Sequence, residues 1–135
     1  MTPTARTLAH LRRLGYVATV VERWLPRVQR RRDAFGADVL AAHPRDGLVL
    51  LVQATTDDHV EARVEKARQR PEVAAWLRAG GKWECWGWTF RAGCWGVRRV
   101  ALRPEDLAAV VVQAPPRRRR RRRGERQRGL FDGLP

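Results

Sequence analysis

In the first half of the chain, apolar and polar residues follow a helical pattern first and an extended pattern afterwards. Leucines recur about every third position in segment 4–14, just before a glycine, which predicts a short amphipathic helix. Segment 16–22 is rich in β-branched residues and predicts a strand, whereas the basic segment 27–32 after a proline predicts a loop. Two more strands are predicted over 37–42 and 48–54, and the Pro and Asp-Gly between them predict a hairpin.

Positions 48–52 are all apolar, so we expect a central strand that is buried on both faces. Segment 57–70 has helical spacing, with an apolar stripe beside a basic stripe, and segment 71–79 predicts a second short helix between a proline and two glycines. Segments 82–90 and 95–102 predict two strands joined as a second hairpin. The order is therefore helix, three strands, helical segment and strand, which predicts an α/β protein.

The chain divides into a folded part and a tail. Its 135 residues, 44% of them hydrophobic, supply enough apolar material for one core. Pro115-Pro116 ends the folded part, and arginine is the commonest residue of the remaining C-terminal segment. We expect one domain over 1–113 and a disordered Arg-rich tail over 114–135.

Charge points to a polyanionic partner. The 28 Lys and Arg residues exceed the 14 Asp and Glu residues and give a net charge of +14, and seven arginines run from Arg117 to Arg123. Neutralising phosphates releases counterions, so a nucleic acid is the simplest partner; the alternative is that arginine serves only solubility. The candidate nucleic-acid contacts are Arg30, Arg31, Arg32, Arg63, Arg117, Arg118, Arg119 and Arg120.

Other classes of protein are disfavoured. Cys85 and Cys94 are too few for a disulfide framework and lack the paired spacing of a zinc site. The N-terminal segment has no signal-peptide core, and no stretch reaches the roughly 18 apolar residues of a membrane span. The expectation is a cytoplasmic protein with reduced cysteines and no membrane partner.

Three segments resemble the motifs of one enzyme superfamily. They are Arg32-Asp-Ala-Phe-Gly-Ala-Asp38-Val-Leu-Ala, Val52-Gln53-Ala54-Thr55 and Ala62-Arg63-Val-Glu-Lys66. With the order of elements, they make residues 8–102 similar to the PD-(D/E)XK nuclease superfamily, in a D…QxT variant of the small phage-type and Holliday junction resolvase-like kind. The resemblance implies a restriction-endonuclease-like αβββαβ core, in which helices flank a central mixed sheet.

The resemblance also implies metal-assisted hydrolysis of phosphodiester bonds. It makes Asp38 the acid that binds Mg²⁺ or Mn²⁺, with Gln53 on the adjacent strand as its partner and Glu22 and Asp33 as further sources of oxygen. Strand geometry agrees, because Asp38 begins one strand of the hairpin and Gln53 lies near the end of the other. The alternative for Asp38 is a turn or cap residue after Gly36.

Two positions depart from the superfamily pattern. Gln53 stands where an acid is expected, and it offers a metal only a neutral carbonyl oxygen. Thr55 stands where lysine is expected, and a hydroxyl group supplies no positive charge for the transition state. Lys66 is the first candidate for a cation that has moved to the following helix, and Arg63 is the second. If these residues form only a solvated face, the site is inactive.

Tryptophans are concentrated in the second predicted hairpin. Strand alternation sends Trp86 and Trp88 to the same face, which favours core packing. The alternative is that these residues, with Trp83, Trp95 and nearby arginines, stack on nucleic-acid bases. Trp24, beside arginines, is a separate candidate for DNA contact.

The tail carries a second short motif. Gln127, Leu130 and Phe131 resemble the peptide that binds the bacterial sliding clamp, in which Gln donates hydrogen bonds and two apolar side chains fill a pocket. The alternative is a chance apolar end.

Together these observations predict a metal-dependent DNA nuclease. An endodeoxyribonuclease is the first expectation, and the sequence leaves exonucleolytic cleavage as an alternative. It would act in replication, recombination or repair in a bacterial cell or phage-infected host, and it could be a homodimer. The first alternative is a catalytically inactive DNA-binding adaptor of the same fold that docks on the clamp. The second is an RNA-binding protein, because arginine-rich segments also bind RNA.

Overall fold

The computed structural model describes residues 1–27 and 30–107, with the side chains of 23–25 and 30–32 left out. Three helices, seven strands and two short 3₁₀ turns follow one another within these residues. In chain order they are α1 (Pro3–Arg13), β1 (Val17–Val20), β2 (Arg23–Leu25), β3 (Arg30–Arg32), β4 (Val39–His43), β5 (Leu48–Thr56), η1 (Asp57–His59), α2 (Val60–Arg68), α3 (Pro71–Arg78), β6 (Lys82–Arg91), β7 (Cys94–Leu102) and η2 (Pro104–Asp106).

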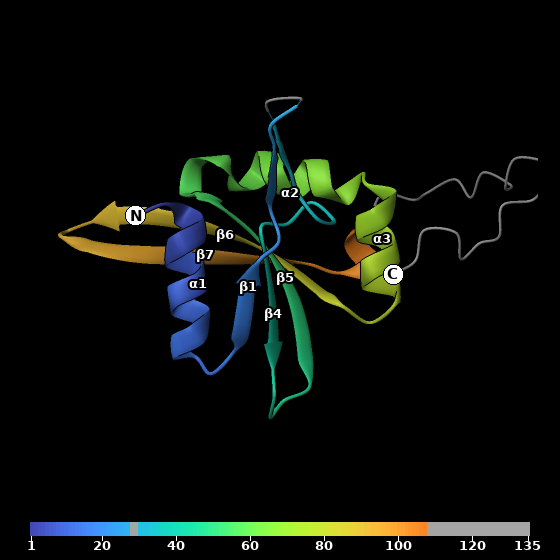
Figure 1. Ribbon diagram of the computed structural model, residues 1–135, viewed down its shortest axis with the longest axis horizontal. Helices are drawn as coiled ribbons and strands as arrows, with labels where there is room; N and C mark the ends of the chain where they lie inside the picture. The colour runs from blue at the N-terminus through green and yellow to red at the C-terminus, as the bar shows by residue number, and fades with distance from the viewer. Residues whose placement is uncertain (28–29, 108–135) are drawn as a thin grey trace, which may run out of the picture.

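Five strands form one mixed sheet in the order β1-β4-β5-β6-β7. Strands β5 and β6 are parallel, and the other neighbouring pairs are antiparallel. The prediction of an α/β protein with a mixed sheet flanked by helices is confirmed, as are both predicted hairpins (Figure 1). Strand β5 is central, although its first two residues, Leu48 and Val49, are exposed and only the positions from Leu50 to Thr55 are buried.

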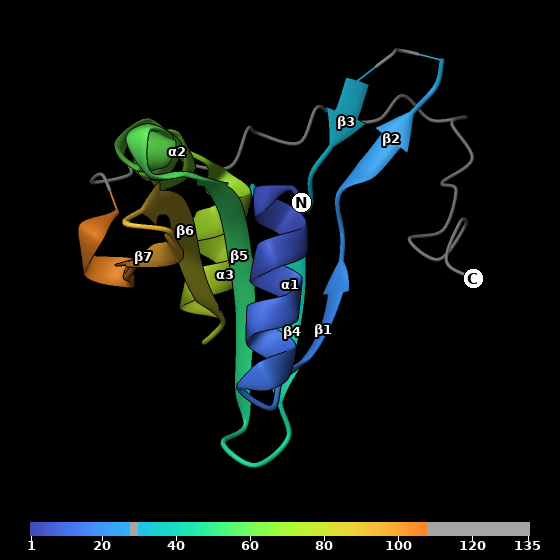
Figure 2. The ribbon, with the colours of Figure 1, turned by 90° about the vertical axis from the view of Figure 1, so that its left-hand side faces the viewer.

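Each face of the sheet carries its own hydrophobic core. Alternation along β5 sends Leu50 and Val52 into a cluster with α1, and Leu51 into a cluster with α2 and α3. Figure 2 shows α1 on one side of β5 and α3 on the other. The core-packing prediction for the second hairpin is confirmed for three tryptophans, because Trp83 lies in one cluster and Trp86 and Trp88 in the other.

The loop predicted over 27–32 is wrong in its second half. Residues Arg30–Arg32 form strand β3, which pairs antiparallel with β2. This two-stranded ribbon projects away from the main sheet (Figure 1). Pairing uses backbone N–H and C=O groups, which arginine supplies as well as valine does, whereas the pattern of apolar residues signals burial and not pairing.

A glycine lets the turn after β5 lie directly on β6. A Cβ atom on Gly87 would lie 2.9 Å from the Cα of Asp57 and closer still to a methyl group of Val60. The absence of a side chain at position 87 therefore allows η1 and the start of α2 to approach the sheet. The close contact of η1 with β6 therefore fixes how near α2 lies to the carboxyl end of β5.

No helix among the described residues is long and apolar enough to span a membrane. The predicted tail, with Arg117–Arg123, Gln127, Leu130 and Phe131, lies outside the described residues.

Candidate active site

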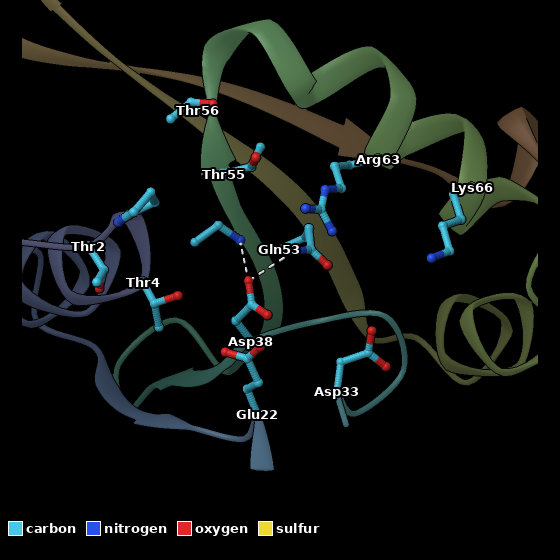
Figure 3. Close-up of a pocket in the computed structure, with 12 residues that line it drawn as sticks. Thr2, Thr4, Glu22, Asp33, Asp38, Gln53, Thr55, Thr56, Arg63 and Lys66 are labelled. Carbon is cyan, nitrogen blue, oxygen red and sulfur yellow. Dashed lines mark hydrogen bonds between the residues drawn. The ribbon is translucent and has the colours of Figure 1, made fainter. Parts of the chain in front are cut away.

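A cavity of about 500 Å³ opens where α1, β4, β5 and α2 meet. Polar and charged side chains dominate its lining, and Figure 3 shows them pointing inward from several elements. The lining residues are Thr2, Pro3, Thr4, Glu22, Asp33, Asp38, Gln53, Ala54, Thr55, Thr56, Arg63 and Lys66.

Asp38 lies at the bottom of this cavity, immediately before β4, with only 6% of its surface exposed. In the register of β4 and β5, Val39 faces Val52, so the next pair in the same direction is Asp38 and Gln53. The amide nitrogen of Gln53 donates a hydrogen bond of 3.0 Å to Asp38 Oδ2, and the backbone N–H of Ala54 donates one of 2.9 Å to the same oxygen. A surface turn or cap residue would not be buried and bonded in this way.

The pKa of Asp38 is raised to about 6. Burial is the largest cause, because it penalises the charged form; the hydrogen bond from Ala54 opposes it, and the nearby charge of Glu22 supports it. Arg63 lowers the pKa and Asp33 raises it by smaller amounts. Asp38 is therefore a carboxylic acid whose charge is costly without a cation, and such groups are common at functional sites.

Two cations reach the cavity from α2, one turn apart. Arg63 and Lys66 are both exposed to solvent, and they line the same cavity as Asp38 and Gln53. In Figure 3, Arg63 extends toward Gln53, and Lys66 extends into the cavity from farther along the helix. The charge of Arg63, the second candidate cation, lowers the pKa of Asp38. The apolar stripe of α2 packs beneath them through Val60 and Ala67.

Asp33 is positioned by an ion pair that the sequence did not reveal. Both carboxylate oxygens of Asp33 accept hydrogen bonds from the guanidinium group of Arg70, at 3.1 to 3.3 Å. Arg70 also donates a 2.6 Å bond to Glu72. Asp33 and Arg70 are 37 residues apart in the chain. In the sequence, Arg70 is indistinguishable from the other residues of the basic stripe in segment 57–70.

A tight turn sets the spacing between Asp33 and Asp38. Ala34 and Ala37 form an isolated bridge around Phe35 and Gly36, whose φ angles are +53° and +68°. Left-handed conformations at both central positions are typical of a type I′ turn, and they are strained for a residue such as phenylalanine. The turn brings the two aspartates to the same cavity.

Four threonines, Thr2, Thr4, Thr55 and Thr56, line the cavity. Thr2 and Thr4 come from the start of α1, where Thr2 Oγ1 accepts a hydrogen bond from the N–H of Ala5. The sequence around Thr4 predicts that a helix starts here. It does not predict that the start of this helix lies in the same cavity as Asp38. Thr55 lies on the same face of β5 as Gln53 and is buried, so it lines the cavity without supplying charge.

The remaining predicted contacts fall elsewhere. Residues Arg30–Arg32 form β3, and their side chains and that of Trp24 are outside the described part of the structure.

Cys85 is a buried free thiol and Cys94 an exposed one. Burial raises the pKa of Cys85 to about 12, so this thiol is not a nucleophile.

The donor groups suit a hard divalent cation. Oδ2 of Asp38 takes both hydrogen bonds, and among the described residues none is donated to its Oδ1. Because Gln53 donates through nitrogen, its carbonyl oxygen is available as a second oxygen ligand. Within residues 1–27 and 30–107, no three His, Cys, Asp or Glu side chains lie close enough together to form a metal site by themselves. A cation here would therefore depend on Gln53, water or the substrate for further ligands.

Comparisons of the chain with protein-family models, with curated proteins and with solved structures find no match.

Proposed function

We propose that this chain is a Mg²⁺- or Mn²⁺-dependent DNA nuclease of the PD-(D/E)XK type, which hydrolyses phosphodiester bonds during DNA replication, recombination or repair. The observation that carries the proposal is the buried pair of Asp38 and Gln53, hydrogen-bonded across β4 and β5 in a cavity that also receives Arg63 and Lys66. The succession of α1, β1, β4, β5, α2 and β6 supports a restriction-endonuclease-like core.

Each side chain has a role in this proposal. Asp38 and Gln53 would hold the cation through side-chain oxygens, and Glu22 and Asp33, which line the same cavity, would add negative charge. The bound ion would activate a water molecule and screen the phosphate. Arg63 and Lys66 bind the phosphate of the substrate and stabilise the charge that develops on it, which the uncharged Thr55 cannot do.

A second candidate is an inactive DNA-binding protein of the same fold. It is favoured by the hydrogen bond from Gln53 and the raised pKa of Asp38, since together they leave the acid satisfied and partly neutral without a metal. In such an inactive protein, Arg63 and Lys66 would bind the phosphate backbone of DNA, and no phosphodiester bond would be cut. Docking on a sliding clamp through Gln127, Leu130 and Phe131, and assembly as a homodimer, remain predictions.

Plasmid nicking in Mn²⁺ or Mg²⁺ separates the two candidates. The wild-type chain should nick supercoiled DNA, Asp38→Ala should abolish nicking, and EDTA should do the same. Asp46→Asn, which changes an exposed acid in the β4–β5 turn, is the matched control and should leave nicking unchanged. Absence of nicking by the wild-type chain in every metal, together with intact DNA binding, would favour the inactive protein.

A further inference from the structure

A second cavity, of about 720 Å³, lies between α1 and the distal half of the β6–β7 hairpin. Its volume is within the roughly 300–1,000 Å³ of typical ligand sites. We call it the α1–β7 groove; it is lined by Met1, Arg6, Ala9, His10, Arg13, Trp88, Trp95, Gly96 and Val97. The candidate active site does not include any of these residues.

Two exposed aromatic rings mark the end of this groove. Phe90 and Trp95 are cross-strand partners near the tip of the hairpin, with ring centroids 5.3 Å apart. They are 57% and 46% exposed, whereas Trp86 and Trp88 on the same hairpin are buried in the core. Core packing therefore accounts for the other tryptophans of the hairpin but not for Trp95. An exposed aromatic pair of this kind is typical of a binding surface.

The groove is basic and has no acid of its own. Helix α1 contains no Asp or Glu, and neither does the chain from Cys85 to Leu102. The guanidinium group of Arg6 lies over the ring of Trp95, 3.6 Å from its centroid, and its N–H groups make no hydrogen bond to the described residues. Arg13 lines the same groove.

Two other arginines, both on β7, are already neutralised. Arg98 bonds to Asp57 and Glu61, and Arg99 bonds to Glu84. Arg6 and Arg13 line the groove beside the exposed rings and remain available to a ligand, as does Arg91 at the end of β6, which has no ion pair among the described residues. Aromatic faces beside uncompensated arginines complement a chain of bases and phosphates.

We propose that the α1–β7 groove binds an unpaired DNA strand, with a base stacked on Phe90 or on the face of Trp95 that Arg6 does not cover, and phosphates bound by Arg6 and Arg13. A duplex hides the faces of its bases, so only an unpaired strand can use the rings. If the chain is a nuclease, as proposed above, its substrate is DNA in which an unpaired strand adjoins the bond that is cut. This part of the inference rests on the proposed function.

The groove and the active-site cavity share helix α1. Thr2 and Thr4 line the cavity, and Arg6, two residues further along, lines the groove. Two residues of helix advance by about 3 Å but rotate by about 200°, so Thr4 and Arg6 project from opposite sides of α1. The groove and the cavity adjoin at the start of the helix, where Met1 lines the groove and Thr2 lines the cavity. Figure 1 shows the hairpin tip extending past the start of α1.

Binding of oligo(dT) and of a blunt duplex of equal length to the full chain tests the proposal. Both are measured by fluorescence anisotropy in EDTA, so that no cleavage is needed. Trp95→Ala should weaken oligo(dT) binding about 5- to 100-fold, the loss expected for one stacked base, and leave duplex binding within twofold. Trp95→Phe should retain most of the affinity, and circular dichroism should show that both variants fold.

Arg6→Ala should reduce the salt dependence of oligo(dT) binding by about one unit in slope, because one phosphate contact is lost. Arg45→Ala, an exposed arginine in the β4–β5 turn, is the matched control for charge and should change oligo(dT) binding less. Equal effects of Trp95→Ala on both DNAs, or no effect on oligo(dT), would overturn the proposal. If Asp38→Ala leaves cleavage intact, the proposed function fails while the strand-binding result stands, since binding is measured without metal.

Discussion

The amide nitrogen of Gln53 lies 3.0 Å from Oδ2 of Asp38, and both residues are buried where β4 and β5 meet. A carboxylate at position 53 would place two acids in contact, and like charges that close raise the pKa of at least one of them. The neutral glutamine therefore limits the negative charge of the pair while it keeps an oxygen for a cation. This relationship makes the ionisation of Asp38 the main electrostatic variable of the site.

Stability should depend on pH through Asp38. Its pKa is raised from 3.8 to about 6 in the folded chain, so the folded state binds this proton more tightly than the unfolded state does. The stabilisation is fully present below pH 3.8 and is lost as pH rises through about 6. The loss amounts to about 3 kcal/mol.

Urea unfolding of wild type and Asp38→Asn at pH 4 and pH 7 measures this effect. The asparagine variant lacks the titration, so between the two pH values its free energy of unfolding should fall by about 2 kcal/mol less than that of wild type, because part of the effect lies below pH 4. Parallel pH profiles for the two proteins would show that Asp38 ionises normally.

Gln53→Glu should make the metal-free chain less stable at neutral pH. The added carboxylate faces Asp38 across the strands, so the cost is about 1–3 kcal/mol. A divalent cation that binds both acids should restore the stability, which thermal unfolding with and without Mn²⁺ would measure. Gln69→Glu changes an exposed glutamine whose side-chain amide donates a hydrogen bond to Glu65; it is the control and should respond to Mn²⁺ no more than wild type. Equal responses of the two variants would argue against a metal at this site.

Arg70 should contribute more stability than an exposed arginine in an ion pair. It is part-buried and holds Asp33 with three hydrogen bonds and Glu72 with one. Arg70→Gln leaves two acids without their cation and should cost about 1–2 kcal/mol. Arg68→Gln, which breaks a more exposed pair with Glu65, should cost at most about 0.5 kcal/mol. Chemical denaturation of both variants makes the comparison, and equal losses would contradict it.

Local patterns in the sequence predicted the elements of the main sheet well, because apolar spacing records burial. The all-apolar run in β5 predicted a central strand, and the motif around Asp38 predicted its position beside Gln53. The β2–β3 ribbon was missed because it pairs through its backbone and carries arginines instead of an apolar pattern.

Long-range partners could not be predicted in the same way. Nothing local distinguishes Arg70 from the other cations of its stripe, because its partner Asp33 is 37 residues away. The order of Arg63 and Lys66 relative to Asp38 depends on the rotation of α2 over the sheet, which packing against β6 decides. The exposure of Trp95 depends on the end of the hairpin reaching past α1, which no pattern within the hairpin records.

Gly87→Ala should be strongly destabilising, whereas Gly96→Ala should not. The new methyl group at position 87 would overlap the side chain of Val60 and the backbone of Asp57, at a cost of about 1–3 kcal/mol. At position 96, on the neighbouring strand, the space is open and the backbone is not left-handed, so alanine should be neutral or slightly stabilising. Thermal unfolding of the pair tests whether the close approach of η1 to β6 holds α2 in place.

Arg63 and Lys66 should differ in their effect on the pKa of Asp38. Arg63 lowers this pKa through its charge, so Arg63→Gln should raise it above about 6, while Lys66→Gln should change it less. The carboxyl carbon of Asp38, followed by ¹³C NMR as a function of pH, gives the pKa in each variant directly. Both substitutions keep a polar side chain at an exposed position of α2, so neither should alter the fold. A larger shift in Lys66→Gln would make lysine, and not arginine, the cation nearest to the acid.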